Sequence, residues 1–273
     1  MNMLNLAGRV CCTFSMNDTQ QMRTVQKVKE NQSRDVVTEL DMKLHEVSEQ
    51  FIAERLPECN LLSEESNHDG FIVSQLLDKD WLIVDPLDGS SNYALGMPNY
   101  GYMAAYLRNG HLVGSVIVLP EQKQYIVREG NQSIYAQPLP LNDSWETGSV
   151  YYAYPPQQST SARQAKFELL NLIDSQSAGM YRYGSACAGL YQLLCGRHMA
   201  FIGHGIRLWD AIAFIPILTA QDIRVIYCIN GLSITLLASR RGDFLENASQ
   251  ILQKHQGLLL HNFDDVTLSL DLQ

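Results

Sequence analysis

The most informative stretch of this sequence is Trp81–Tyr93, which reads WLIVDPLDGSSNY. It begins with a continuous apolar run of the length of a buried strand. The run ends at Asp85, and Pro86 restricts the backbone that follows. Gly89 permits a tight bend directly after a second carboxylate at Asp88. The segment therefore predicts a strand that delivers two carboxylates to the start of a helical turn.

The serines that complete this segment point to phosphate chemistry. Ser90 and Ser91 are good N-caps, and the backbone N–H groups at a helix N-terminus attract phosphate. The neighbouring carboxylates are suited to a hard cation such as Mg²⁺. Asp-Pro and Asp-Gly are also ordinary turn dipeptides, so this segment by itself fits a plain strand-ending loop equally well.

Two further acidic segments favour the metal interpretation. Glu64 and Glu65 follow a short apolar strand candidate, Asn60–Leu62, and the repulsion between such neighbours is relieved by a cation. Alone, this pair would fit a solvated loop. Asp210 lies in an apolar environment where an unpaired carboxylate is costly to bury, so it is expected to be a helix N-cap, a metal ligand or both.

Composition limits the classes of partner. The 273 residues are 46% hydrophobic and 18% charged, which predicts a globular core. Lys and Arg number 20 against 29 Asp and Glu, giving a net charge of −9. This balance argues against nucleic-acid binding and against docking on an anionic membrane. A small phosphate ester remains a possible partner, because bound Mg²⁺ would reverse the local field.

The cysteines and histidines give no sign of another chemistry. The six cysteines contain no C-x-x-C pair, which predicts free thiols in a reducing compartment. Cys187 and Cys195 are expected in an apolar helix without a basic partner, which disfavours either as a nucleophile. His198 and His204 are predicted to be surface or loop residues. Without a signal peptide or a membrane-length apolar run, we expect a cytoplasmic protein.

Hydrophobic patterning predicts an α+β first half and an α/β second half. One or two helices are expected within residues 4–28, and a stronger helix over 36–56 with a Thr38–Asp41 capping box. Short strands joined in part by an Asn109-Gly110 hairpin are predicted at 81–84, 100–107, 112–119, 124–127 and 134–136. In the second half, strands at 149–153, 180–183, 199–202, 223–228 and 232–238 alternate with helices at 160–173, 186–195, 209–220 and 243–254. A boundary is expected near 141–148.

Four segments together resemble the inositol monophosphatase family of lithium-sensitive, magnesium-dependent phosphatases. They are Asp35–Asp41, Ser63–Ser66, Trp81–Tyr93 and Trp209–Ala213, in the family's order. Tyr183–Ala186 looks like the family's substrate-side turn. The resemblance implies an α+β fold, the layered α-β-α-β-α sandwich of the inositol monophosphatase and fructose-1,6-bisphosphatase type. Residues 1–142 would supply a large antiparallel sheet and most metal ligands, and 143–273 a smaller mixed sheet with Asp210 and substrate contacts.

The resemblance also implies a role for each matching residue. Two or three Mg²⁺ ions would be held by Glu64, Asp85, the Leu87 carbonyl, Asp88 and Asp210, with Asp85 shared between ions. The residues that act on the attacking water would be Asp41 and Ser90, with Glu64 also catalytic through a third ion. Phosphate would be bound by the backbone N–H groups of Gly89, Ser90 and Ser91. Substrate contacts would come from Asp88, Gly184, Ser185 and Ala186, and Glu65 would support the ligands.

The resemblance implies Mg²⁺-dependent hydrolysis of a phosphate monoester by a metal-activated water, with a sugar or polyol phosphate as substrate. One departure weakens inositol phosphate as the particular substrate. Seven positions before Asp210, where the family has an acid that contacts substrate hydroxyls, this chain has Gly203. Phe214 and residues 219–222 also depart from the family pattern, without touching the metal ligands.

Two alternatives stay open. A 3′(2′),5′-bisphosphate nucleotidase would need an aromatic shelf for adenine, which Tyr154 or Tyr183 could supply. A non-catalytic regulatory or binding protein that keeps the fold is the alternative of another class, although every expected ligand is present. The resemblance further implies a homodimer and inhibition by lithium.

Overall fold

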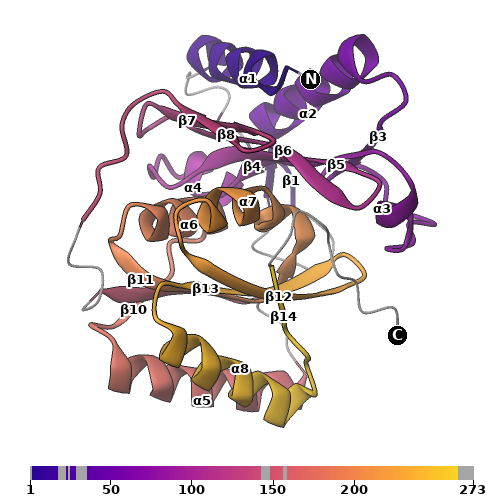
Figure 1. Ribbon diagram of the computed structural model, residues 1–273. Coiled ribbons are helices and arrows are strands. Elements are labelled where there is room, and N and C mark those ends of the chain that lie inside the picture. The colour runs from indigo at the N-terminus through magenta and orange to yellow at the C-terminus, as the bar shows by residue number, and fades with distance from the viewer. Residues whose placement is uncertain are drawn as a thin grey trace.

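The computed structural model describes residues 2–17, 23, 25–28, 36–142, 148–155 and 159–263, and these form five layers (Figure 1). Two sheets alternate with three layers of helices, as the sequence analysis predicts. The helical layers are, in order, α1 (Met3–Asn17) with α2 (Glu39–Arg55), α6 (Ala186–Leu194) with α7 (Ile215–Thr219), and α5 (Thr160–Gln176) with α8 (Gly242–Gln256). The α+β sandwich is thus confirmed.

The first sheet has the strand order β3-β4-β5-β6-β7-β8. Its strands are β3 (Asn60–Ser63), β4 (Trp81–Asp88), β5 (Gly101–Arg108), β6 (His111–Leu119), β7 (Gln124–Glu129) and β8 (Gln132–Tyr135). β3 runs parallel to β4, and the other pairs are antiparallel. The antiparallel sheet expected of the first half thus contains one parallel pair, at this edge. The predicted hairpin is present, since Asn109 and Gly110 both have positive φ, as a type I′ turn requires.

The second sheet has the strand order β10-β9-β11-β13-β12-β14. Its strands are β9 (Ser149–Ala153), β10 (Met180–Tyr181), β11 (His198–Arg207), β12 (Arg224–Asn230), β13 (Ser233–Ser239) and β14 (His261–Asn262). β10 and β11 run parallel to β9, and the remaining pairs are antiparallel. Both sheets have six strands among the described residues, so the expectation of a smaller second sheet is wrong.

Two predicted helical regions are divided differently in the structure. Helix α1 lies in the first region, but Val25–Val28 is a strand, β1, which pairs with β2 (Val36–Thr38). The predicted helix over 209–220 is two short 3₁₀ turns, η3 (Leu208–Asp210) and η4 (Ile212–Phe214), followed by α7. Pro216 lies in the first turn of α7, where a missing N–H is tolerated. Asp35 lies outside the described residues.

A single hydrophobic core joins the two halves of the chain. It contains side chains from the first sheet (Met103, Ile117), from α6 (Leu190) and from the second sheet (Phe201), together with Phe214. The middle helical layer is therefore apolar toward both sheets, which explains why nearly every residue of α6 is buried. This shared core fixes the position of the second half relative to the carboxylates at the end of β4.

The prediction that His198 and His204 lie at the surface is wrong. Both belong to β11 and are 2% exposed. Each ring nitrogen of His198 has a partner, with Nδ1 2.8 Å from Ser149 Oγ and Nε2 3.1 Å from Tyr183 Oη. His204 lies 3.1 Å from Tyr152 Oη. These hydrogen bonds offset the cost of burying a polar ring. Neither histidine lines the carboxylate pocket described below.

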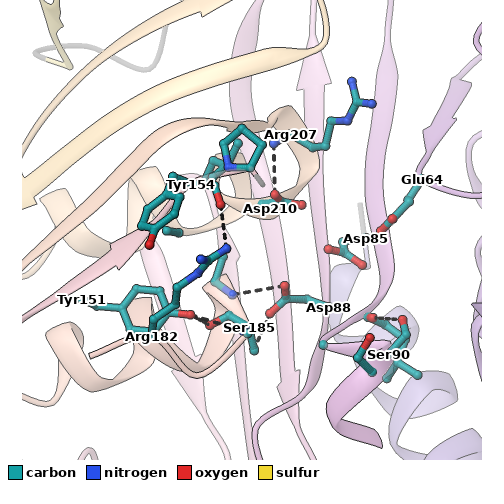
Figure 2. A pocket seen from close by; sticks show the side chains of 18 of the residues that line it. Glu64, Asp85, Asp88, Ser90, Tyr151, Tyr154, Arg182, Ser185, Arg207 and Asp210 are labelled. Atoms are coloured by element: carbon teal, nitrogen blue, oxygen red, sulfur yellow. Dashed lines mark hydrogen bonds between the residues drawn. The ribbon is translucent and has the colours of Figure 1, made fainter. Parts of the chain in front are cut away.

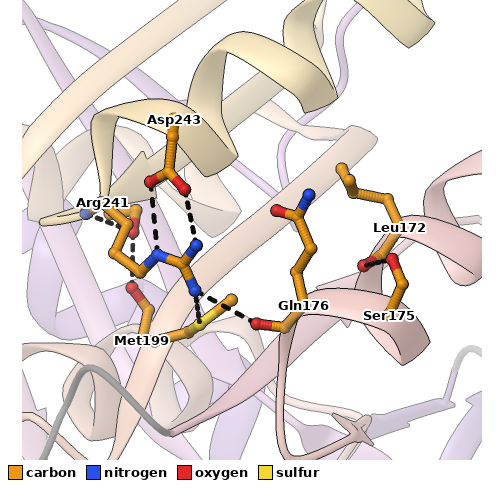
Figure 3. Close-up of polar contacts among 7 residues, drawn as sticks. Leu172, Ser175, Gln176, Met199, Arg241 and Asp243 are labelled. Atoms are coloured by element: carbon orange, nitrogen blue, oxygen red, sulfur yellow. Dashed lines mark hydrogen bonds and ion pairs between the residues drawn. The ribbon is translucent and has the colours of Figure 1, made fainter.

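The outer helical layer is tied to the second sheet by Arg241, directly before α8 (Figure 3). Its guanidinium donates to Asp243 at 2.6 Å and to the Gln176 carbonyl at the end of α5 at 3.2 Å. Its backbone N–H donates to Ser239 Oγ, which in turn donates to the Met199 carbonyl. Arg241 thus connects α5 and α8 through its side chain and strand β11 through its backbone N–H and Ser239.

All six cysteines are free, and Cys187, Cys195 and Cys228 are buried. Burial raises the pKa of the Cys187 thiol well above its ordinary value, which opposes a nucleophilic role. In the part of the chain that the structure describes, no helix is both long and apolar enough to cross a membrane.

Candidate functional site

The site begins where β4 ends. Every residue of β4 is buried, and α4 (Ser90–Ala94) starts two residues after the strand's final carboxylate. The connecting residue, Gly89, has a φ of 87°, and a Cβ there would lie 2.6 Å from the Asn99 carbonyl oxygen. Only glycine fits this position without a backbone shift. The turn predicted from the sequence therefore places Asp85 and Asp88 beside the N-terminus of α4.

Ser90 is paired with Asp41, as the resemblance implies. The Ser90 hydroxyl lies 2.5 Å from Asp41 Oδ1, and it also approaches the Leu87 carbonyl at 2.7 Å. The other carboxylate oxygen of Asp41 accepts hydrogen bonds from the backbone and side chain of Thr38, which completes the predicted capping box. Asp41 is 2% exposed, and burial raises its pKa to about 6.

Asp88 caps helix α6 of the second half. Its carboxylate accepts hydrogen bonds from the Ser185 hydroxyl and from the backbone N–H groups of Ala186, at 3.1 Å, and Cys187, at 2.7 Å (Figure 2). Burial raises its pKa to about 6, although these hydrogen bonds act in the opposite direction. The predicted metal ligand and the predicted substrate turn are thus in direct contact.

Tyr151 holds this arrangement and was not predicted from the sequence. Its hydroxyl donates to the Ser185 carbonyl at 2.7 Å and accepts from the Ser185 N–H at 3.2 Å. The ring is buried against Gly189, where a Cβ would lie 2.5 Å from it. A tyrosine in an apolar strand carries no sequence signal for such a role, because the turn that it binds lies 34 residues away.

Asp85 is the carboxylate of the site that has a buried oxygen without a hydrogen-bond partner among the described residues. It is 1% exposed, and its Oδ1 finds no hydrogen-bond partner among the described residues. Burial raises its pKa well above the ordinary value, and the charges of Glu64, Asp88 and Asp210 raise it further. Burial also raises the pKa of Asp210, whose Oδ2 accepts the Arg207 N–H at 3.0 Å. A buried, unpaired carboxylate among others is costly without a positive charge.

One cavity of about 450 Å³ gathers most of the predicted site residues. It is lined by Glu64, Asp85, Leu87, Asp88, Gly89, Ser90, Ser91, Gly184, Ser185, Ala186 and Asp210. Asp41 and Glu65 do not line it. Asp41 reaches the cavity through Ser90, and the charge of Glu65 contributes to raising the pKa of Asp41.

The donor set fits Mg²⁺ in chemistry. It consists of carboxylate oxygens and one backbone carbonyl, which are the hard ligands that Mg²⁺ prefers, and one buried oxygen of Asp85 has no partner among the described residues. Among those same residues, no three or more Asp, Glu, His or Cys side chains lie close enough together to hold a metal ion in the arrangement that the structure has. The assignment of individual ligands stays a prediction.

Two cations of the pocket were also not predicted from the sequence. Arg182 and Arg207 line the same cavity, together with Tyr154 and Ser233. Arg182 lies directly before the predicted substrate turn, and Arg207 lies three residues before Asp210, so their proximity in sequence to site residues was the available signal.

The protein has a five-layer α-β-α-β-α fold, and residues from both halves of the chain line its carboxylate-rich cavity. This arrangement is that of a phosphatase family. The chain belongs to the inositol monophosphatase family, whose model matches residues 8–263.

Named relatives fall into two groups. A Nus factor SuhB from Pasteurella multocida is 26% identical over 184 residues, 66% of this chain and 67% of the relative. A fructose-1,6-bisphosphatase/inositol-1-monophosphatase from Thermotoga maritima is 24% identical over 180 residues, 66% of each chain. The relatives thus include one named for two phosphatase activities and one named as a Nus factor.

Solved structures support the fold. The extragenic suppressor protein suhB from Bartonella henselae superposes with a TM-score of 0.73 at 20% identity, over 92% of this chain and 97% of that one. An IMPase/NADP phosphatase complexed with Mg²⁺ and phosphate gives a TM-score of 0.73 at 16% identity, over 94% of this chain and 98% of that one.

Proposed function

We propose that this protein is a Mg²⁺-dependent phosphomonoesterase that hydrolyses a small sugar or polyol phosphate by direct attack of water. The observation that carries the proposal is the Ser90–Asp41 pair, which opens into the same cavity as the unpaired oxygen of Asp85. A base and a cation site beside one another are what water-driven phosphate hydrolysis requires.

The protein's own groups would act as follows. The oxygen of Ser90 accepts a hydrogen bond from the attacking water, while the Ser90 proton is held by Asp41. As water attacks phosphorus, its proton moves to Ser90 Oγ and the Ser90 proton moves to Asp41 Oδ1. The backbone N–H groups of Gly89, Ser90 and Ser91 bind the phosphoryl oxygens. The bond to the alcohol oxygen then breaks, and the leaving alkoxide takes a proton from solvent water while Asp41 releases its proton to solvent, which gives inorganic phosphate and the free alcohol.

The metal ligands complete the proposal. Glu64, Asp85, the Leu87 carbonyl, Asp88 and Asp210 would hold two or three Mg²⁺ ions. When bound, these ions supply the positive charge that offsets the phosphate dianion and the leaving alkoxide. Asp88 would be the most constrained ligand, because both its oxygens already accept hydrogen bonds from the Ser185 turn and the start of α6.

The resemblance supplies two further features of the proposal, inhibition by lithium and a homodimer. We also expect a cytoplasmic location, as inferred from the cysteines and the sequence pattern. We also propose that residues 1–142 and 143–273 act as two subdomains of one site, a division supported by the order of the two sheets.

A non-catalytic regulatory or binding role is the second candidate, and it is favoured by the relatives that are named Nus factor SuhB rather than for an enzyme activity. Catalysis is preferred because the Ser90–Asp41 pair and all the predicted carboxylate ligands are retained. A protein that has only a binding role has no need of this combination.

The test is hydrolysis of p-nitrophenyl phosphate and myo-inositol 1-phosphate with and without Mg²⁺. We expect Mg²⁺-dependent release of phosphate that is lost in Asp85→Asn. Asp174→Asn, which changes an exposed aspartate of α5, is the matched control and should keep full activity. Purified chain that binds Mg²⁺ but hydrolyses no phosphate ester would favour the non-catalytic candidate.

A further inference from the structure

Two of the predicted metal ligands, Glu64 and Asp210, come from opposite halves of the chain. Glu64 lies in the turn Ser63–Ser66, directly after β3, and Asp210 ends the 3₁₀ turn η3. Figure 2 shows the two side chains reaching the cavity from different segments. In the part of the chain that the structure describes, the acids do not yet lie close enough to hold an ion. The position of one segment relative to the other therefore matters for cation binding.

The side chain of His68 is attached to the first of these segments. Its Nε2 lies 2.7 Å from the Ser63 carbonyl oxygen, so the ring nitrogen donates and the carbonyl accepts. The same carbonyl accepts the Ser66 N–H at 3.0 Å, which is the hydrogen bond that closes the turn around Glu64. His68 therefore holds the peptide group that directly precedes Glu64.

The same imidazole ring also contacts the second segment. It stacks on the indole of Trp209, with the ring centroids 5.0 Å apart and the ring planes inclined by 26°. Trp209 directly precedes Asp210, is 3% exposed and belongs to the core that joins the two halves of the chain. A closely packed core side chain is a firm support for a neighbour. One histidine thus contacts the residue before Glu64 and the residue before Asp210.

The residues around His68 are attached to the first half of the chain. The Phe71 N–H donates to the His68 carbonyl at 3.1 Å, and the Phe71 ring meets Trp81 of β4 edge-on at 5.5 Å. Asn67 and Asp69 are exposed and hydrogen-bond to each other. It is through the His68 ring that this segment stacks on η3 of the second half.

We infer that His68 is a positioning residue for the metal site, which holds the turn of Glu64 against η3 and so sets the separation between Glu64 and Asp210. This inference rests on the metal ligands of the proposed function. His68 does not line the cavity, so it acts through Ser63 and Trp209 and does not touch the substrate. Because Mg²⁺ demands a near-ideal octahedron of oxygens, a looser pair of ligand segments would lower its affinity.

Titration calorimetry with Mg²⁺ tests the inference without relying on turnover. In His68→Ala, we expect the Kd for Mg²⁺ to rise about 10-fold, the range for loss of a group that orients a metal ligand. At saturating Mg²⁺, kcat should stay within about twofold of the parent value, because the loaded site keeps the Ser90–Asp41 pair. His111→Ala, which changes an exposed histidine at the start of β6, is the matched control and should leave both values unchanged.

Two conservative variants separate the contacts of His68. His68→Phe keeps an aromatic ring against Trp209 but removes the donor to the Ser63 carbonyl, while His68→Gln keeps a donor and removes the ring. We expect each to raise the Kd for Mg²⁺ by about 3-fold, less than His68→Ala does, since each loses one of the two contacts. Both keep a side chain of similar size, so they also guard against a folding defect in His68→Ala.

The emission of Trp209 gives an independent readout. The chain has three tryptophans, and the difference between the parent protein and Trp209→Phe isolates this one. Because Trp209 lies between the His68 stack and Asp210, we expect its emission to change as Mg²⁺ is added to the EDTA-treated protein. In His68→Ala, the midpoint of that change should move to an Mg²⁺ concentration about 10-fold higher, in step with the calorimetric Kd.

The inference and the proposed function fail in different ways. Mg²⁺-dependent hydrolysis with a parental Kd for Mg²⁺ in His68→Ala overturns the inference and leaves the proposed function standing. A raised Kd in this variant, in a chain that hydrolyses no phosphate ester, supports the inference and removes the proposed function. A lower Tm in EDTA with an unchanged Kd shows that the stack only stabilises the fold, which overturns the inference. A parent chain that binds no Mg²⁺ overturns both.

Discussion

The hydroxyl of Ser90 lies 2.5 Å from a carboxylate oxygen of Asp41, although 49 residues separate them in sequence. Ser90 belongs to the first turn of α4 and Asp41 to the first turn of α2. The pair therefore depends on how α2 packs against the first sheet, and Leu40 and Leu44 of α2 share a core with Leu87 and Tyr93.

Removing this pair should abolish turnover while keeping the fold. In Ser90→Ala and Asp41→Asn, we expect kcat to fall by about 100-fold or more, in the range of losing a general base. Steady-state hydrolysis of myo-inositol 1-phosphate measures the loss, with circular dichroism as the check on folding. Ser90→Thr keeps the hydroxyl and should retain most of the activity. Ser90→Ala with parental kcat would exclude the proposed proton route.

Asp85→Asn should have opposite effects on stability with and without metal. In EDTA, we expect it to raise Tm, because it removes a buried negative charge that is repelled by Glu64, Asp88 and Asp210. With Mg²⁺, the parent protein should be stabilised by ligand linkage and the variant should not. Differential scanning fluorimetry in both buffers checks the sign. An Asp85→Asn variant that is stabilised by Mg²⁺ as strongly as the parent protein would contradict the ligand assignment.

Tyr151→Phe should weaken the site by releasing the Ser185 turn that contacts Asp88. We expect the Mg²⁺ concentration for half-maximal activity to rise about 10-fold, consistent with loss of support for a metal ligand. Tyr152→Phe is a matched control, since its hydroxyl is also buried but meets His204. A purely structural role for Tyr151 would lower Tm in both variants and leave the Mg²⁺ dependence unchanged.

His198 should make folding stability fall in acid. Burial lowers the pKa of His198 from 6.5 to about 4. Between these values the unfolded chain binds a proton that the folded chain does not, so stability is present above pH 6.5 and is lost as pH falls toward 4. The shift corresponds to about 3 kcal/mol. Urea unfolding from pH 4 to 7 should show a smaller pH dependence for His198→Gln than for the parent protein. Parallel curves would refute the prediction.

Arg241→Met should reduce stability without affecting catalysis. It removes the hydrogen bonds that join α5 and α8 at Gln176 and Asp243 (Figure 3). We expect the free energy of unfolding to drop by about 1–2 kcal/mol, the range for charged hydrogen bonds that are partly exposed. Arg163→Met, an exposed position of α5, provides the comparison in the same urea assay and should change stability far less.

The local sequence determined those elements whose backbone conformation depends only on a few adjacent residues. The apolar run before Asp85, the bend at Gly89 and the hairpin at Asn109 each follow from the preferences of a few adjacent residues, and the structure confirms them. The carboxylates of the site could be identified for the same reason, because in the sequence they directly follow predicted strands or lie within apolar stretches. The resemblance supplied the layered fold, because the order of its four segments extends over most of the chain.

Only the tertiary structure decided which distant residues act together. β3 became a parallel edge strand because it pairs with β4, and His198 became a core residue because Ser149 and Tyr183 satisfy its ring. Such partnerships depend on which strands pair and which side chains pack beside them, and this leaves no local pattern in the sequence. The clearest case is Arg182, which lines the cavity with the acids of β4. Its hydrogen bond to the Tyr154 carbonyl joins residues that are 28 positions apart, so no local pattern indicates it.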